Sequence, residues 1–195
     1  MRYGIRTDSG THPKFDRVIS TIPIPSKPSK NEISFHVEND RNLSLVSLFI
    51  HAEPTTTFSV LYNHSKEGLW KRVTNFGHIY RLASRSPILC VEITLPPDSP
   101  LTPDELFLDF QSSCESLGVF HGEIEFITSE CTDFAYPNMI QRNEAEVREI
   151  KESFQGSGIA LLGRQGEFKH ISSSECMARV AEYLATHEKE LSSRS

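Results

Sequence analysis

The first half of the chain consists of short apolar runs, rich in β-branched residues and bounded by proline, glycine or polar residues. This pattern predicts strands rather than helices. The connection NHSKEG between the third and fourth runs is typical of a hairpin, and the segment 26–32 is typical of a polar loop. The runs that predict strands are 17–24, 43–51, 56–62, 70–76 and 88–95.

The first clear helix is predicted between Thr102 and Gly118. Thr102 is suited to cap its start, with Pro103 at the first helical position and Glu105 completing a capping box. Gly118 is suited to end it. The apolar residues that recur at helical spacing are Leu106, Phe107, Phe110, Cys114 and Leu117.

Two further helices are expected, one at 143–155 with Asn143 as its cap, and one after Ser172. Strands are expected at 122–129 and 159–162. The order of elements favours an α+β fold, with a mainly antiparallel sheet and about three helices. The last helix carries one apolar stripe, formed by Cys176, Val180, Leu184 and Leu191.

Composition and charge narrow the classes of function. The 195 residues are expected to form one domain, or one domain plus part of a second. Their net charge of −6 argues against binding to nucleic acid or to an anionic membrane. No apolar run approaches the roughly 18 residues of a membrane helix. The N-terminus lacks the apolar core of a secretory signal, so we expect a cytoplasmic protein.

Several chemical motifs are missing from the sequence. The eight histidines show no H-x-H or H-E-x-x-H spacing, so no metal site is predicted. There is no G-x-S-x-G, no G-x-G-x-x-G, no Walker A motif and no acid–base pair at short spacing that would favour a cofactor-free enzyme. With no C-x-x-C, the cysteines are expected to be reduced core thiols: Cys90, Cys114, Cys131 and Cys176.

The segment IALLGRQGEFKHISSSE, residues 159–175, is the strongest candidate for ligand binding. It predicts a strand, a glycine-containing loop and a capped helix start. Gly163 and Gly166 would allow backbone to approach a ligand, and Arg164 would supply donors to an anion such as phosphate. The alternative is an ordinary turn in which Arg164 pairs with Glu167 or Glu175.

Two other segments could contact a substrate. WKRVTNFGHIYR, residues 70–81, places Arg72 and other cations among aromatic residues, which suits a phosphorylated or aromatic substrate or simply a solvated strand face. In FAYPN, Tyr136 precedes Pro137 and could contact substrate, or could be a rigid strand exit.

Taken in order, FDRVISTIPI, WKRVTNF, CVEIT, FAYPN and GIALLGRQGEFKHI resemble the C-terminal half of FAD-dependent amine-oxidoreductase-like flavoproteins. Within that group, UDP-galactopyranose mutases and protoporphyrinogen-oxidase-like proteins are the most similar, over roughly residues 15–185. The resemblance implies a single, incomplete substrate domain over 1–195, with part of a FAD/NAD(P)-binding-type fold. Segment 159–190 would contact FAD.

The resemblance also implies roles for individual residues. Arg72 and Tyr136 would lie on the substrate side, and no catalytic residue is assigned. The residues that would contact the cofactor are Gly163, Arg164, Gly166, Glu167, Ser172 and Ser173.

The family's dinucleotide motif is missing from this chain, so FAD is expected only if a Rossmann-type domain or partner chain completes the site. We therefore expect part or a subunit of a FAD-dependent oxidoreductase or nucleotide-sugar mutase, inactive alone. The alternative is a non-catalytic ligand-binding or interaction module. Expected partners are a separate FAD-binding chain or a second copy, and a nucleotide sugar or other small molecule.

Overall fold

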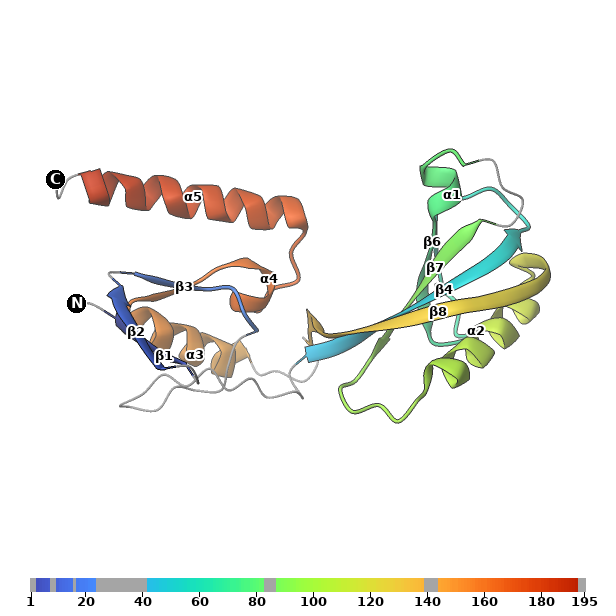
Figure 1. Cartoon of the computed structure of the whole chain (residues 1–195), viewed down its shortest axis with the longest axis horizontal. Helices are drawn as coiled ribbons and strands as arrows, with labels where there is room; N and C mark the ends of the chain where they lie inside the picture. Colours follow the sequence, from blue (N-terminus) through green and yellow to red (C-terminus); the bar gives the residue numbers. More distant parts are fainter. Residues whose placement is uncertain are drawn as a thin grey trace. The chain divides into compact units, whose positions relative to one another are not determined.

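The computed structural model describes residues 3–7, 10–15, 17–23, 42–82, 87–138 and 144–192. The predicted loop 26–32 and the predicted cap Asn143 lie outside them. The chain divides into two compact units (Figure 1). Unit 1 comprises residues 1–41 and 136–195, and unit 2 comprises residues 42–135.

Unit 2 is built on a five-stranded sheet with the strand order β5-β6-β7-β4-β8. The registered pairs β5–β6, β6–β7 and β4–β7 are all antiparallel, and Leu48 and Val73 both pair with Val91. The strands are β4 (Asn42–Pro54), β5 (Val60–Tyr62), β6 (Trp70–Asn75), β7 (Ile88–Leu95) and β8 (Phe120–Pro137).

Most of the strand predictions for this unit are confirmed. β7 has the predicted bounds. The hairpin between 56–62 and 70–76 is also present, although β5 covers only the last three residues of the predicted strand 56–62. β8 is much longer than the predicted 122–129. It is the outermost strand beside β4 and exposes many polar side chains, so its sequence lacks a long apolar alternation.

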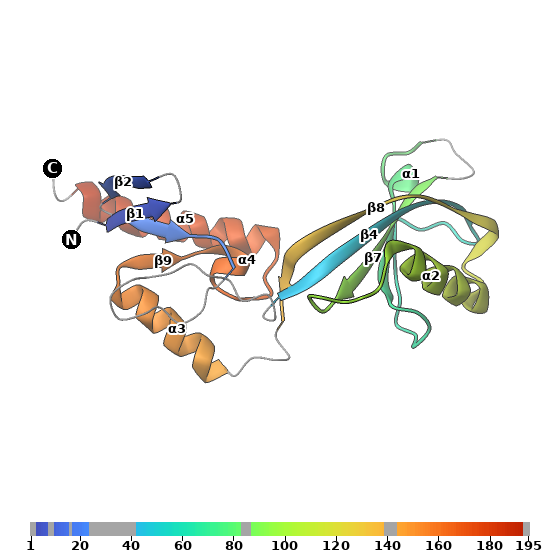
Figure 2. The same cartoon turned by 60° about the horizontal axis from the view of Figure 1, so that its bottom comes forward.

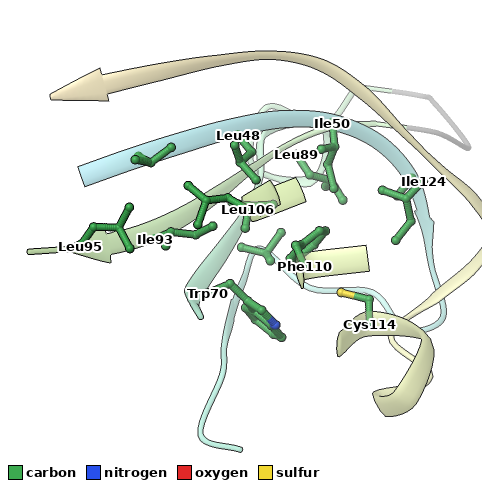
Figure 3. Packing of buried hydrophobic residues seen from close by; sticks show 14 residues of the cluster. Leu48, Ile50, Trp70, Leu89, Ile93, Leu95, Leu106, Phe110, Cys114 and Ile124 are labelled. Carbon is green, nitrogen blue, oxygen red and sulfur yellow. The ribbon is translucent and has the colours of Figure 1, made fainter. Parts of the chain in front are cut away.

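One face of this sheet forms the core of unit 2. Along β4, Val46, Leu48 and Ile50 are buried while the intervening residues are partly exposed, as expected for a strand with one covered face. Figure 3 shows Leu48 and Ile50 pointing toward Leu106 and Phe110. The buried cluster consists of Val46, Leu48, Ile50, Ala52, Trp70, Val73, Leu89, Val91, Ile93, Leu95, Leu106, Phe110, Cys114 and Ile124.

Helix α2 (Pro103–Leu117) covers that face, and its predicted caps are confirmed. The Thr102 hydroxyl accepts the Glu105 N–H, and the Glu105 carboxylate accepts the Thr102 N–H at 2.8 Å. Gly118 ends the helix at φ +62°. The buried side of α2 includes Phe110, whose ring meets Trp70 edge-on with centroids 5.8 Å apart. A single-turn helix, α1 (Phe76–Ile79), follows β6.

Unit 1 contains a parallel strand pair that the sequence pattern did not predict. β3 (Val18–Ser20) pairs with β9 (Ile159–Leu161), and Figure 2 shows β9 between α3 (Glu144–Gly156) and α5 (Ser173–Ser192). A short hairpin, β1 (Tyr3–Thr7) and β2 (Gly10–Phe15), was also not predicted. The buried hydrophobic cluster of unit 1 consists of Ile150, Phe154, Ile159 and Phe168.

Three sequence predictions for unit 1 need correction. The predicted strand 17–24 is short, and Ile19 within it is 45% exposed. The predicted loop GRQGEFKH begins with a helical turn, α4 (Gly163–Gly166). The apolar stripe of the last helix is present but faces outward, with Val180 38% and Leu184 49% exposed.

The prediction of four core thiols is correct only in part. All four cysteines are free, and Cys90 and Cys114 are buried. Burial raises the pKa of the Cys114 thiol to about 12. Cys131 is exposed because it lies on the outermost strand β8, and Cys176 is half-buried. No helix among the described residues is long and apolar enough to cross a membrane.

We expect the Ser113 hydroxyl to be important for the stability of unit 2. The Trp70 Nε1–H donates to it at 2.6 Å, and Trp70 is only 2% exposed. Ser113→Ala leaves that buried donor without its partner, at a cost of about 1–3 kcal/mol in the free energy of unfolding. The measurement is urea unfolding followed by fluorescence of Trp70, the single tryptophan.

The neighbouring Ser112 is exposed on the same helix and provides the matched control. Ser112→Ala should stay within about 0.5 kcal/mol of the unsubstituted chain. Equal unfolding midpoints for the two variants would show that the Trp70–Ser113 bond contributes nothing.

Candidate functional site

The predicted anion-binding segment starts where β9 ends. Leu162 donates its N–H to the Ser20 carbonyl at 3.0 Å, which extends the β3–β9 pairing by one bond. The chain then turns at Gly163, whose φ of +81° lies in the left-handed region that favours glycine. A Cβ at Gly163 would meet nothing within 4 Å, so its backbone faces open space.

The second glycine of the segment packs against the chain itself. Gly166 is buried, and a Cβ there would lie 2.5 Å from the Ser20 carbonyl oxygen and 3.3 Å from the Thr21 Cα. The lack of a side chain at Gly166 thus allows a close approach of backbone, but it is the β3 end of the chain that fills the space beside it. This contact fixes the α4 turn against β3.

Arg164 does not form the ion pair that the alternative interpretation required. Its Nε–H donates to the Ile171 carbonyl at 2.8 Å, and its guanidinium carbon lies 5.4 Å from the centre of the Tyr136 ring. Among the described residues, no carboxylate lies within ion-pair distance of Arg164. Glu167 and Glu175, the expected partners, are engaged elsewhere.

The structure groups Arg164 with two rings. Tyr136, at the end of β8, stacks on His170 with ring centroids 5.9 Å apart and an interplanar angle of 16°. The resemblance implies that Tyr136 lies on the substrate side and Arg164 at the cofactor, and the structure brings these two side chains together in unit 1. His170 was missed because its only signal is this stacking, which depends on the tertiary fold.

Glu167 holds the α4 turn to α5. Its carboxylate accepts a hydrogen bond from Arg179 at 2.8 Å and lies 3.5 Å from the Lys169 ammonium group. These two cations balance the charge of the Glu167 carboxylate, whose side chain is only 12% exposed. Glu167 also lines a cavity of about 790 Å³ beside α5.

The predicted capping box at the start of α5 is confirmed. The Ser172 hydroxyl accepts the Glu175 N–H, and the Glu175 carboxylate accepts the Ser172 N–H at 2.7 Å. These bonds from Ser172 lower the pKa of the Glu175 carboxyl. Ser173 follows as the first, exposed residue of the helix. An anionic ligand here would meet the negative charge of Glu175.

Arg72 lies in unit 2, on the face of the sheet opposite α2. It stands directly across from Glu92 on β7 and forms an ion pair with it. The Glu92 carboxylate, with a smaller contribution from Tyr62, raises the pKa of the Arg72 guanidinium. A substrate anion would have to compete with Glu92 for this cation. No group of metal-binding side chains is present among the described residues.

The folds of two solved structures match this arrangement. No family sequence model matches the chain, and no curated protein matches it by sequence. A reduced UDP-galactopyranose mutase matches with a TM-score of 0.61 and 15% sequence identity, over 84% of this chain and 38% of its own. A protein assigned as a protoporphyrinogen oxidase from Exiguobacterium sp. 255-15 matches with a TM-score of 0.54 and 14% sequence identity. That match covers 84% of this chain and 39% of the other protein's chain.

The chain has the fold of part of these proteins. The resemblance predicted from the sequence is thus confirmed at the level of the fold, and so is the α+β class. The chain spans about two-fifths of the length of each match, so more than half of either protein has no counterpart here.

Gly166 provides a test of how the site is built. Gly166→Ala places a Cβ against the Ser20 carbonyl, and the backbone must shift, at a cost of about 1–3 kcal/mol. We expect faster hydrogen exchange of the β9 amides and of the Leu162 amide. Gly156→Ala is the control, because a Cβ at Gly156 meets nothing within 4 Å. Equal exchange in both variants would contradict a packing role for Gly166.

Proposed function

We propose that this chain is part or a subunit of a FAD-dependent oxidoreductase or nucleotide-sugar mutase. It contributes one edge of the flavin site, and a Rossmann-type domain or partner chain contributes the remainder. The observation that carries this proposal is the fold match over 84% of the chain to about two-fifths of a UDP-galactopyranose mutase. The sequence resemblance over residues 15–185 supports the same conclusion.

The residues at the end of β9 fit a role at a flavin diphosphate. Gly163 presents backbone to open space, and Arg164 carries a positive charge with no carboxylate partner among the described residues. Both features suit a phosphate group approaching the α4 turn. When bound, FAD would supply the flavin ring that carries the redox or transfer chemistry.

The other predicted cofactor residues act within the chain. Gly166 packs on β3, Glu167 pairs with Arg179, and Ser172 caps α5. We therefore propose that these three shape the α4 turn and orient Arg164, while Gly163 and Arg164 contact the cofactor.

Tyr136 and Arg72 are proposed to contact the substrate. Tyr136 stacks on His170 and lies beneath the Arg164 guanidinium, so a nucleotide sugar or another small anion there would meet an aromatic ring and a cation together. Arg72 would bind an anion only by sharing its charge with Glu92.

Two features of unit 1 support docking of an α/β domain. Parallel strands occur almost only in sheets covered on both faces, whereas β3 and β9 form a pair of three residues each. On α5 the apolar stripe is exposed, with Met177 at 74%, Val180 at 38% and Leu184 at 49%. We propose that a nucleotide-binding domain covers this stripe.

The second candidate function is a non-catalytic ligand-binding or interaction module. The capping box favours it, because the Glu175 carboxylate occupies the start of α5, where a helix would otherwise attract an anion. The DNA around the coding sequence separates the two. The first candidate expects a G-x-G-x-x-G motif in frame upstream of Met1 or in a neighbouring gene; its absence from both would favour the second.

We expect the purified chain to be colourless and to become flavin-bound only with such a nucleotide-binding domain. Arg164→Ala should then abolish flavin retention in the mixture. It should cost only about 1 kcal/mol in the free energy of unfolding, since it removes one hydrogen bond and one cation–ring contact. The measurements are flavin absorbance after gel filtration and urea unfolding.

Arg148→Ala is the matched control, since Arg148 is an exposed cation on α3 in the same unit. It should leave flavin retention intact. Flavin bound to the chain alone at one per chain would contradict the need for a second domain. Equal retention in the two variants would remove Arg164 from the cofactor site.

Exposed apolar stripes promote association, so we expect the isolated chain to self-associate through α5. Leu184→Glu should shift it toward the monomer and prevent capture of the nucleotide-binding domain. Leu108→Glu alters a leucine on α2 in unit 2 that is 61% exposed, and it should change neither property. The measurement is the molar mass in solution, determined by light scattering across a concentration series. A monomer for the unsubstituted chain at all concentrations would contradict the expectation.

A further inference from the structure

A large cavity in unit 1 is not used by the proposed flavin contact. It measures about 790 Å³ and lies between β9, α3 and α5, and its lining does not include Arg164. Pockets for small molecules commonly measure about 300–1,000 Å³, so this one can hold a ligand of nucleotide size. Lys151 from α3, Ala160 from β9 and Tyr183 from α5 each line it.

The side of α5 that faces the cavity is polar. Its lining residues recur at helical spacing and are Arg179, Glu182, Tyr183, Thr186 and His187. The apolar stripe with Val180 and Leu184 lies on the other side of the helix and is exposed. A helix that packs on a core turns its apolar stripe inward. The reversed orientation of α5 indicates that the cavity suits a polar occupant.

The cavity lining carries more positive than negative charge. Four cationic residues line it, against two carboxylates, Glu167 and Glu182. Arg179 and Lys169 both lie beside the Glu167 carboxylate and share their positive charge with it. The whole chain has a net charge of −6, so the lining of this cavity has the opposite sign of charge to the chain as a whole. The four cationic residues are Arg17, Lys151, Lys169 and Arg179.

The cavity also contains a flat aromatic surface. The Tyr183 and His187 rings stack with centroids 4.0 Å apart and an interplanar angle of 27°. The His187 Nδ1–H donates to the Tyr183 carbonyl at 2.7 Å, which holds the imidazole in place. A ring fixed in this way is suited to stack on a planar base.

We propose that this cavity binds a nucleoside phosphate. The phosphate groups are held by the cationic residues, including Lys169 and Arg179, and the base lies against Tyr183. Charge-assisted bonds to phosphate and stacking of the base are the interactions that these residue types provide. The site requires only residues of unit 1, so it goes beyond the proposed function and does not depend on a second domain.

The test is calorimetric titration of the full chain with ADP, adenosine and inorganic diphosphate. ADP should bind, and adenosine and diphosphate should each bind more weakly. Tyr183→Leu should weaken ADP binding at least about fivefold and leave diphosphate binding unchanged. Lys169→Gln, which alters an exposed side chain, should weaken both ADP and diphosphate binding at least about fivefold.

Matched controls lie in unit 2. Tyr80→Leu and Lys71→Gln alter exposed residues of the same types and should leave both affinities unchanged. Arg148→Ala alters an exposed cation of α3 outside the cavity lining and should also leave ADP binding unchanged. Circular dichroism checks that each variant is folded. Absence of ADP binding, or equal effects of the cavity variants and their controls, would overturn the proposal.

Discussion

The candidate site depends on one close contact between segments far apart in the sequence. Gly166 lies against the backbone of Ser20 and Thr21, with no room for a side chain. This contact, with the bond from Leu162 to Ser20, fixes the α4 turn at the end of β9. Because Arg164 lies within α4, the position of this turn determines where the Arg164 side chain starts. Within unit 1, Arg164 and, through its bond to the Ile171 carbonyl, the approach to α5 thus depend on one anchor.

Unit 2 follows a different constraint, because α2 covers only one face of its sheet. The buried face is apolar and closely packed around Phe110. The opposite face includes Arg72 and Glu92, which neutralise each other across adjacent strands. An ion pair on a partly exposed sheet face contributes little to stability by itself. It does place charged groups on a rigid surface, where a ligand could exchange for one of them.

The sequence predicted best what is encoded locally. The bounds of β7 and both caps of α2 follow from residues within a few positions of each other. The parallel pairing of β3 with β9 could not be predicted, because it joins segments about 140 residues apart and neither strand is long enough for a clear pattern. The stacking of His170 on Tyr136 could not be predicted either, because it also depends on the tertiary fold. The sequence suggested Arg164 as a candidate, but only the fold showed which groups surround it.

The length and position of β8 have a further consequence. As the outermost strand, it has an edge that could pair with a strand of another molecule and start aggregation. Four of its exposed residues are acidic: Glu123, Glu125, Glu130 and Asp133. Like charges that face each other repel, so these side chains disfavour pairing of two β8 edges. Replacing these side chains by neutral ones would remove the repulsion and favour pairing of the β8 edges of two copies.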